Sequence, residues 1–195
     1  VVLTAGLSPA QKQAMLDAAR RHVLRILGPN CLGLLSPAAG LNVSFAPPGA
    51  LEAGSLAFVS QSGALATAML DWARHNGVGF SGVVSLGQNA AVDLAQVLDF
   101  LASDPRTQGI LVYLEGISNA RRFMSALRSA AHAKPVVVLK AGRRPAGNEA
   151  AQTHCRAIVG SDEVFDAALR RAGAVRVRTF VELFSAAKCL ASRYR

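Results

Sequence analysis

Apolar and polar positions alternate in blocks along most of the chain. Short runs rich in Val, Ile and Leu are separated by longer stretches in which apolar residues recur at helical spacing. This pattern predicts five strands, at residues 55–60, 82–86, 109–115, 135–140 and 174–178. Between and after them it predicts five helices, at residues 63–75, 92–103, 119–133, 161–172 and 181–193.

The runs VVSL, ILVYL and VVVL are apolar on both faces, as strands are when helices cover both sides of a parallel sheet. Five successive strand–helix units predict a doubly wound, five-stranded parallel sheet of flavodoxin-like type in an α/β domain. In such a sheet ligands bind at the carboxyl ends of the strands. Residues 60–63, 87–91, 115–116 and 140–144 follow these strand ends.

The first 47 residues have a different pattern. A serine followed by proline begins a predicted helix at 8–22, and the run VLRIL at 23–27 predicts a short strand. The opening VVLTAG is typical of a buried strand, so we expect the sequence to be a segment of a longer polypeptide. Pro-Pro-Gly at 47–49 marks a boundary, with a linker at 46–49, between domains at residues 1–47 and 48–195.

Composition excludes several classes of protein. No apolar run is long enough to cross a membrane. The three cysteines are widely separated and indicate neither a disulfide framework nor a zinc site. We therefore expect no metal ligands and a cytoplasmic protein. The net charge is +9, but the arginines are scattered in pairs, mostly on predicted helices and without aromatic interleaving, which argues against nucleic acid as a partner. A GxGxxG match at 77–82 follows a helix and precedes a strand, the reverse of a dinucleotide site.

The stretch SLAFVSQSGALATAML runs from a predicted strand through a tight turn into a helix. The first amides of that helix have no helical acceptors, and together with the helix dipole they form an anion site. We predict phosphate binding by Ser60, Gln61, Ser62, Gly63 and Ala64. The alternative is that Ser62 only caps its own helix.

His154 lies in a long polar loop that leaves the carboxyl end of a predicted strand. An imidazole facing a helix N-terminus suits phosphoryl transfer, because the amides hold the charge of a phosphohistidine. Glu115, at the end of another strand, would accept the second imidazole N–H and fix the tautomer. A hydrolase triad of Ser62, Glu115 and His154 is the alternative, although the first glycine of a nucleophile elbow is missing.

Five segments occur in an order that resembles one family: GPNCLGL, LAFVSQSGAL, YLEGI, KPVVVLKAGR and THCRAIVGSDEVFDAALRRAG. They resemble the NDP-forming acyl-CoA synthetases, which are relatives of the succinyl-CoA synthetase alpha chain. The resemblance implies that residues 1–47 are the end of a Rossmann CoA-binding domain and that 48–195 are a flavodoxin-like ligase domain. It also implies acid–thiol ligation through an acyl phosphate and a phosphohistidine that reaches an ATP-grasp domain or subunit.

Carried over by position, the resemblance makes His154 the phosphorylated residue and Glu115 its orienting carboxylate. Asn30 and Cys31 would lie near the thiol of CoA or acyl-CoA. Phosphate would bind at the helix start, whereas ATP or ADP and Mg²⁺ would bind to the ATP-grasp partner. The resemblance is also compatible with a homo-oligomer.

The chain departs from the family pattern in two loops. Cys155 and Arg156 follow the histidine where the family usually has Thr-Gly, and Ala91 replaces an aspartate. These changes favour an alternative within the same resemblance, a non-catalytic acyl-CoA-sensing module of a bacterial protein lysine acetyltransferase. In that case the full chain would also contain a GNAT-type domain.

Overall fold

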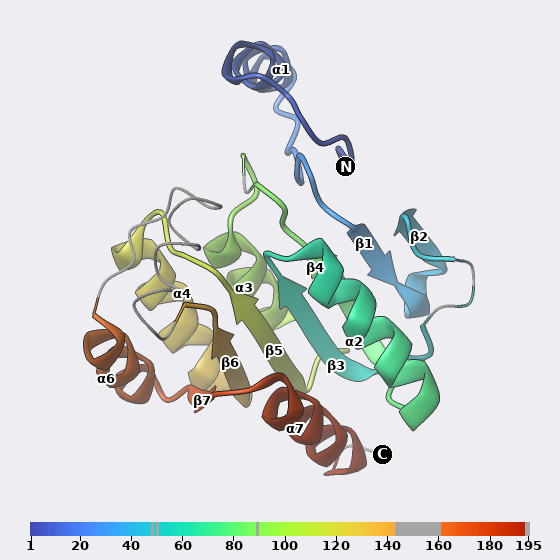
Figure 1. Ribbon diagram of the computed structural model, residues 1–195, viewed down its shortest axis with the longest axis vertical. Helices are drawn as coiled ribbons and strands as arrows, with labels where there is room; N and C mark the ends of the chain where they lie inside the picture. Colours follow the sequence, from blue (N-terminus) through green and yellow to red (C-terminus); the bar gives the residue numbers. More distant parts are fainter. Residues whose placement is uncertain (48, 50, 89, 143–160, 194–195) are drawn as a thin grey trace.

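A computed structural model describes residues 1–47, 49, 51–88, 90–142 and 161–193 (Figure 1). Its strands are β1 (Gly33–Ser36), β2 (Leu41–Ser44), β3 (Ala53–Ser60), β4 (Phe80–Ser85), β5 (Gly109–Leu114), β6 (Val136–Lys140) and β7 (Val175–Val177). Its α-helices are α1 (Pro9–Arg21), α2 (Gly63–Asn76), α3 (Leu94–Ser103), α4 (Ala120–Ala133), α6 (Asp162–Ala172) and α7 (Phe180–Arg193), and a short 3₁₀ helix, η1, spans Pro37–Ala39.

The strands form one seven-stranded sheet in the order β2-β1-β4-β3-β5-β6-β7. Its last five members are parallel, which confirms the predicted parallel sheet. The predicted number of five strands is too low for the whole sheet, because β1 and β2 add an antiparallel pair beside β4. Each added strand has only four residues, too few for a clear period in the sequence.

The parallel strands follow the flavodoxin order, in which the second strand lies beside the first and the others follow on its other side. The chain thus passes from β3 to β4 on one side, then crosses back to place β5, β6 and β7 on the other side of β3. This reversal places the switch point between the carboxyl ends of β3 and β5. The last five residues of β3 are buried, and β5 is buried along its entire length.

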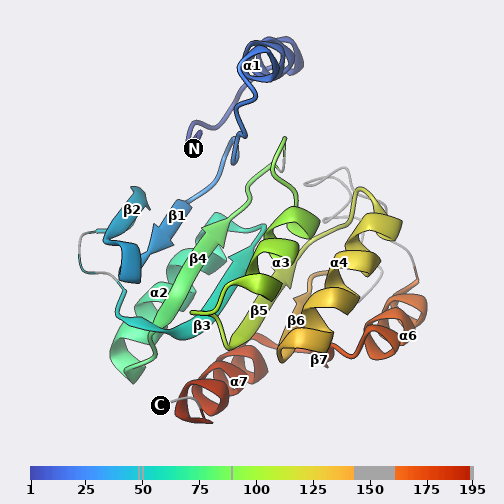
Figure 2. The same cartoon turned by 180° about the vertical axis from the view of Figure 1, so that it is seen from behind.

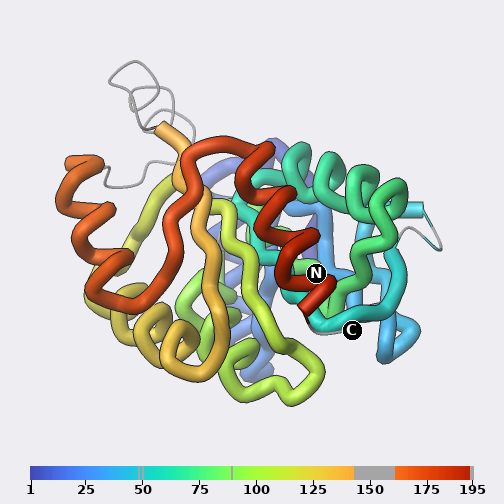
Figure 3. Tube along the Cα trace, turned by 90° about the horizontal axis from the view of Figure 1, so that it is seen from below, coloured from blue at the N-terminus to red at the C-terminus, as the bar shows by residue number. Residues whose placement is uncertain are grey.

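Helices cover both faces of the sheet, as Figures 2 and 3 show. On one face α2 and α7 pack on a cluster that includes Phe58, Phe80 and Met69, all with no exposed surface. On the other face α3, α4 and α6 pack on Val112, Leu114 and their neighbours. Burial of this apolar surface at about 25 cal/mol per Å² is the main force that stabilises the fold.

Helix starts and ends follow local chemistry. Ser8 and Asp93 form capping boxes with the residues three positions on, at the starts of α1 and α3. The helix α2 ends at Gly77, which has a left-handed backbone with φ of 61°. These signals explain why the predicted helix bounds agree closely with those of the structure.

The segment before β1 corrects two predictions. Neither VVLTAG nor VLRIL forms a strand; isolated hydrogen bonds hold them instead, among them those from Val2 N to Leu27 O (2.9 Å) and from Val92 N to Ile26 O (3.0 Å). Val23 and Leu24 are 84% and 63% exposed, so these two apolar residues are not part of a buried strand. The predicted helix at 8–22 is confirmed as α1, which projects away from the sheet (Figure 1).

Within the described part of the chain, none of the helices combines the length and apolar character needed to cross a membrane. Strands on both sides of residue 47 belong to the same sheet, because β1 pairs with β4. The division into domains at 1–47 and 48–195 stays a prediction.

Candidate functional site

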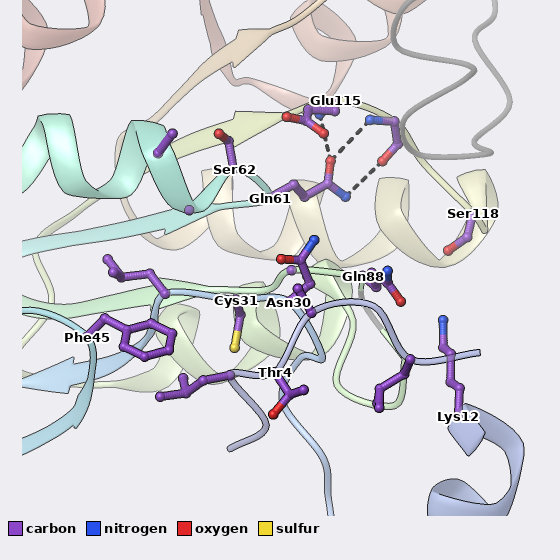
Figure 4. Close-up of a pocket in the computed structure, with 18 of the residues that line it drawn as sticks. Thr4, Lys12, Asn30, Cys31, Phe45, Gln61, Ser62, Gln88, Glu115 and Ser118 are labelled. Carbon is purple, nitrogen blue, oxygen red and sulfur yellow. Dashed lines mark hydrogen bonds between the residues drawn. The ribbon is translucent and has the colours of Figure 1, made fainter. Parts of the chain in front are cut away.

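A cavity of about 1130 Å³ lies at the switch point, above the carboxyl ends of β3, β4 and β5 (Figure 4). One wall comes from residues 61–64 and 115–116, at the ends of β3 and β5. The opposite wall comes from the N-terminal segment, with Thr4, Lys12, Asn30 and Cys31 among its members. The volume suits a ligand larger than a single phosphate.

The turn between β3 and α2 is held by its own serines. The Ser60 hydroxyl donates to Ser62 O (2.8 Å) and accepts from Ser62 N (3.1 Å). Ser60 is fully buried and is not among the residues that line the cavity, so it shapes the turn. The Ser62 hydroxyl accepts from Leu65 N (3.3 Å) and caps α2, as the alternative prediction has it.

The start of α2 also faces the cavity. Gly63 and Ala64 line it, and as the first two residues of the helix their amides have no acceptor within the helix. A Cβ atom at Gly63 would lie 3.6 Å from Leu32 N, which is an ordinary contact. The fold therefore does not require glycine here, whereas a ligand that approaches these amides would benefit from its absence of a side chain.

Gln61 and Glu115 meet across the switch point. The Gln61 Oε1 atom accepts from Glu115 N (2.6 Å) and Gly116 N (3.1 Å), and its Nε2 donates to Gly116 O (2.9 Å). Figure 4 shows the Glu115 side chain in the same wall of the cavity as Ser62. A carboxylate thus stands beside the amide-rich start of α2.

On the opposite wall Asn30 and Cys31 are fixed by the N-terminal segment. Asn30 N donates to Thr4 O (2.9 Å), and the Cys31 thiol donates to Val2 O (3.4 Å). Burial raises the pKa of the Cys31 thiol, so it stays protonated at neutral pH. This wall is joined to the loop after β4 by a hydrogen bond from Gln88 N to Pro29 O (2.8 Å).

The structure brings seven of the nine predicted site residues into one cavity: Gln61, Ser62, Gly63, Ala64, Glu115, Asn30 and Cys31. Ser60 lies beneath the turn, and His154 lies outside the described residues, as do Cys155 and Arg156. Sequence reasoning missed the lining residues Thr4, Lys12, Phe45 and Ser118. One signal was present for Thr4. The glycine of LTAGLSP indicates a turn before the helix, and a turn is not compatible with a continuous strand through Thr4.

The backbone of Ser62 bears on the hydrolase alternative. A nucleophile elbow holds its serine in a strained turn, but Ser62 has ordinary extended angles, φ −104° and ψ 121°. Its hydroxyl is engaged as a helix cap. The geometry favours an anion-binding helix start over a serine nucleophile.

Fold and site together define an α/β domain of flavodoxin-like topology, with a helix start that faces a cavity at the switch point of its sheet. Comparison with known families agrees with this class. The family model for the "Succinyl-CoA ligase like flavodoxin domain" matches residues 53–190, and the chain belongs to this family. The predicted resemblance and fold class are thereby confirmed.

Several characterised proteins are similar over nearly the whole chain. Acetate–CoA ligase [ADP-forming] I of Archaeoglobus fulgidus is 41% identical over 97% of this chain. The alpha subunit of acetate–CoA ligase [ADP-forming] I of Pyrococcus furiosus is 40% identical over 93%. The chain spans 28% and 39% of the lengths of these relatives.

A solved structure shows the same arrangement. The dinucleotide-forming acetyl-coenzyme A synthetase 1 of Candidatus Korarchaeum cryptofilum, in complex with phosphate and ADP, has a TM-score of 0.91 and 34% identity. The match covers 97% of this chain and 42% of that one.

Proposed function

We propose that this chain is the ligase domain, with an adjoining part of the CoA-binding region, of an ADP-forming acyl-CoA synthetase acting on acetyl-CoA or a related short-chain thioester. The observation that carries the proposal is the cavity that unites the start of α2, Glu115 and the Asn30–Cys31 turn. Relatives named as ADP-forming acetate–CoA ligases support the acyl group and the reaction.

In this reaction phosphate attacks the thioester carbonyl, the carbon–sulfur bond breaks, and acyl phosphate and CoA thiol form. The amides of Gly63 and Ala64, which line the cavity, would hold the phosphate while it attacks. Asn30 and Cys31 would lie beside the leaving sulfur. The protonated Cys31 thiol does not compete as a nucleophile.

The neutral imidazole of His154 then attacks the phosphorus of the acyl phosphate, which releases the carboxylic acid and leaves a phosphohistidine. Glu115 would accept the other imidazole N–H and hold the ring in the reactive tautomer. The role of His154 and the role of Glu115 toward it rest on the family motif, because His154 lies outside the described residues.

The nucleotide half of the reaction belongs to a partner. The described residues contain no group of three or more acidic, His or Cys side chains suited to a metal ion. We infer that ADP or ATP and Mg²⁺ bind to an ATP-grasp domain or subunit, to which the phosphohistidine passes its phosphoryl group. One similar protein is itself named an alpha subunit.

The test uses the full-length protein incubated with labelled ATP and Mg²⁺. We expect label that is stable to alkali, labile to acid and absent from the His154→Ala variant. A folded protein that binds acetyl-CoA but never takes up label would contradict the ligase. That outcome would favour the acyl-CoA sensor, for which Ala91 in the loop after β4 already supplies a sequence argument.

A further inference from the structure

The side chain of Gln61 continues the sheet where β3 ends. Parallel pairing between β3 and β5 stops at Ser60 and Tyr113, and Gln61 N adds one more bond to Tyr113 O (3.2 Å). At the next position the chain turns into α2, so the backbone of β3 can no longer serve as a neighbour for β5.

The amide group of Gln61 takes the place of that missing peptide. Its oxygen accepts from Glu115 N (2.6 Å) and Gly116 N (3.1 Å), and its nitrogen donates to Gly116 O (2.9 Å), as the dashed lines in Figure 4 show. A side-chain amide carries a carbonyl acceptor and N–H donors, as a peptide group does. Its oxygen can therefore accept from both backbone amides while its nitrogen donates to the carbonyl.

These bonds fix the backbone that carries the Glu115 side chain. On the other edge of β5, the ladder to β6 ends with a bond from Ala141 N to Leu114 O (2.9 Å), one residue before Glu115. Gln61 therefore holds the first residue after β5, which lies beyond both ladders and borders the cavity.

We propose that Gln61 is a positioning residue that sets the direction of the Glu115 carboxylate for phosphoryl transfer. The proposal rests on the proposed function, since it gives Gln61 a role only through Glu115. It differs from the predicted phosphate contact, because the Gln61 side chain is directed at the backbone of residues 115–116. A small misorientation of a catalytic group lowers a rate strongly without weakening the binding of a distant substrate.

The test measures the rate of histidine labelling from ATP in the full-length protein. Gln61→Met keeps the length of the side chain but removes all three bonds, and we expect labelling to slow about tenfold or more with KM for ATP unchanged. Gln108→Met is the matched control, because Gln108 is exposed at the opposite end of β5. We expect it to label at the wild-type rate.

A double-mutant cycle with Glu115→Gln separates positioning from a general structural effect. If Gln61 acts through Glu115, then Gln61→Met lowers the rate little further once the Glu115 carboxylate is gone. If the two reductions multiply instead, the positioning role is overturned. A Gln61→Met protein that labels as fast as wild type overturns it as well.

Two further outcomes are distinguishable. If the wild-type protein carries no histidine phosphate, the proposed function fails and the role of Gln61 fails with it. If Gln61→Met does not fold, Gln61→Glu takes its place in the cycle, because a carboxylate still accepts from both amides and loses only the bond to Gly116 O. We expect its rate to lie between those of wild type and Glu115→Gln, and a wild-type rate would contradict the proposal.

Discussion

Single residues in this site divide into those that build the turn and those that face the cavity. Ser60 and Ser62 alternate with Gln61 along the chain, yet only the serine hydroxyls bond within the turn itself. Gly63 and Ala64 expose amides to the cavity. The sequence motif predicts an anion site at this turn, and the structure shows that the serines hold the turn whereas Gly63 and Ala64 face the cavity.

Replacement of Gly63 by alanine should separate function from stability. The new methyl group meets Leu32 N at 3.6 Å, so we expect the free energy of unfolding to change by less than about 0.5 kcal/mol. It would occupy space in front of the α2 amides, so we expect KM for phosphate to rise about tenfold. Thermal unfolding and steady-state kinetics of the full-length enzyme measure the two effects.

Gly82→Ala is the matched control, since its Cβ would meet Leu35 O at 3.4 Å and Gly82 does not line the cavity. Its KM for phosphate should equal that of the wild type. An unchanged KM in Gly63→Ala would show that phosphate does not bind at the start of α2.

Cys31 should be a slow nucleophile despite its place in the cavity wall. Burial raises its pKa above the ordinary value of 9.0, so the reactive thiolate is scarce at neutral pH and becomes common only in more alkaline solution. Alkylation by iodoacetamide, followed by peptide mass spectrometry, should modify the exposed Cys189 well before Cys31. Equal rates near neutral pH would contradict this assignment.

Among the elements, the parallel strands were predictable and the edge strands were not. Runs such as ILVYL are apolar on both faces because helices cover them, and that pattern appears in the sequence. β2 instead has three of its four residues exposed, and its pairing with β1 gives no local signal. The strand predicted at VLRIL was wrong for the opposite reason: the run is apolar, but two of its apolar residues are exposed.

The cavity as a whole could not be predicted, because it depends on contacts between segments that are distant in the sequence. Gly87, with φ of 58°, lies so close to the N-terminal turn that a Cβ atom there would be 2.3 Å from Pro29 O. This close approach holds the N-terminal turn against the loop after β4. Topology predicted the sheet side of the site, whereas the N-terminal side depended on packing between distant segments.

The opposite end of the sheet contains a polar network that should affect stability alone. Burial would raise the pKa of Asp104, but hydrogen bonds from Arg106 and Thr107 outweigh it and lower the pKa below the ordinary 3.8. A lowered pKa stabilises the fold above the unfolded-state value, and this contribution is lost as pH falls through the folded-state value.

We therefore expect Asp104→Asn to reduce the free energy of unfolding by about 2 kcal/mol at neutral pH, and the deficit to shrink as the pH falls below 3.8. Denaturant titrations across pH measure this difference. Histidine labelling should be unaffected, because Asp104 follows α3 at the end of the sheet opposite the cavity. A deficit that grows in acid would contradict the assigned shift.

At the scale of the whole molecule, the N-terminal segment belongs to the sheet as well as to the cavity. β1 covers the edge of β4 through Leu34 and Leu35, and Leu35 is almost fully buried. Residues 1–47 therefore contribute to the stability of the flavodoxin-like unit, even though the family model begins at residue 53.

Removal of residues 1–47 should expose the β4 edge and destabilise what remains. We expect Tm of residues 48–195 to lie about 10 °C below that of residues 1–195, with a tendency to aggregate. Calorimetry and size-exclusion chromatography provide the comparison. An equal Tm and a single monomeric peak would instead support residue 47 as the boundary of an independent domain.

In the function proposed above, the start of α2 and Glu115 form the phosphoryl site of a ligase. A crystal structure of the full-length protein grown with phosphate and CoA tests it most directly. We predict a phosphate within hydrogen-bonding distance of the Gly63 and Ala64 amides, with the CoA sulfur beside Asn30 and Cys31. Phosphate bound elsewhere, while this helix start faces only water, would contradict the account.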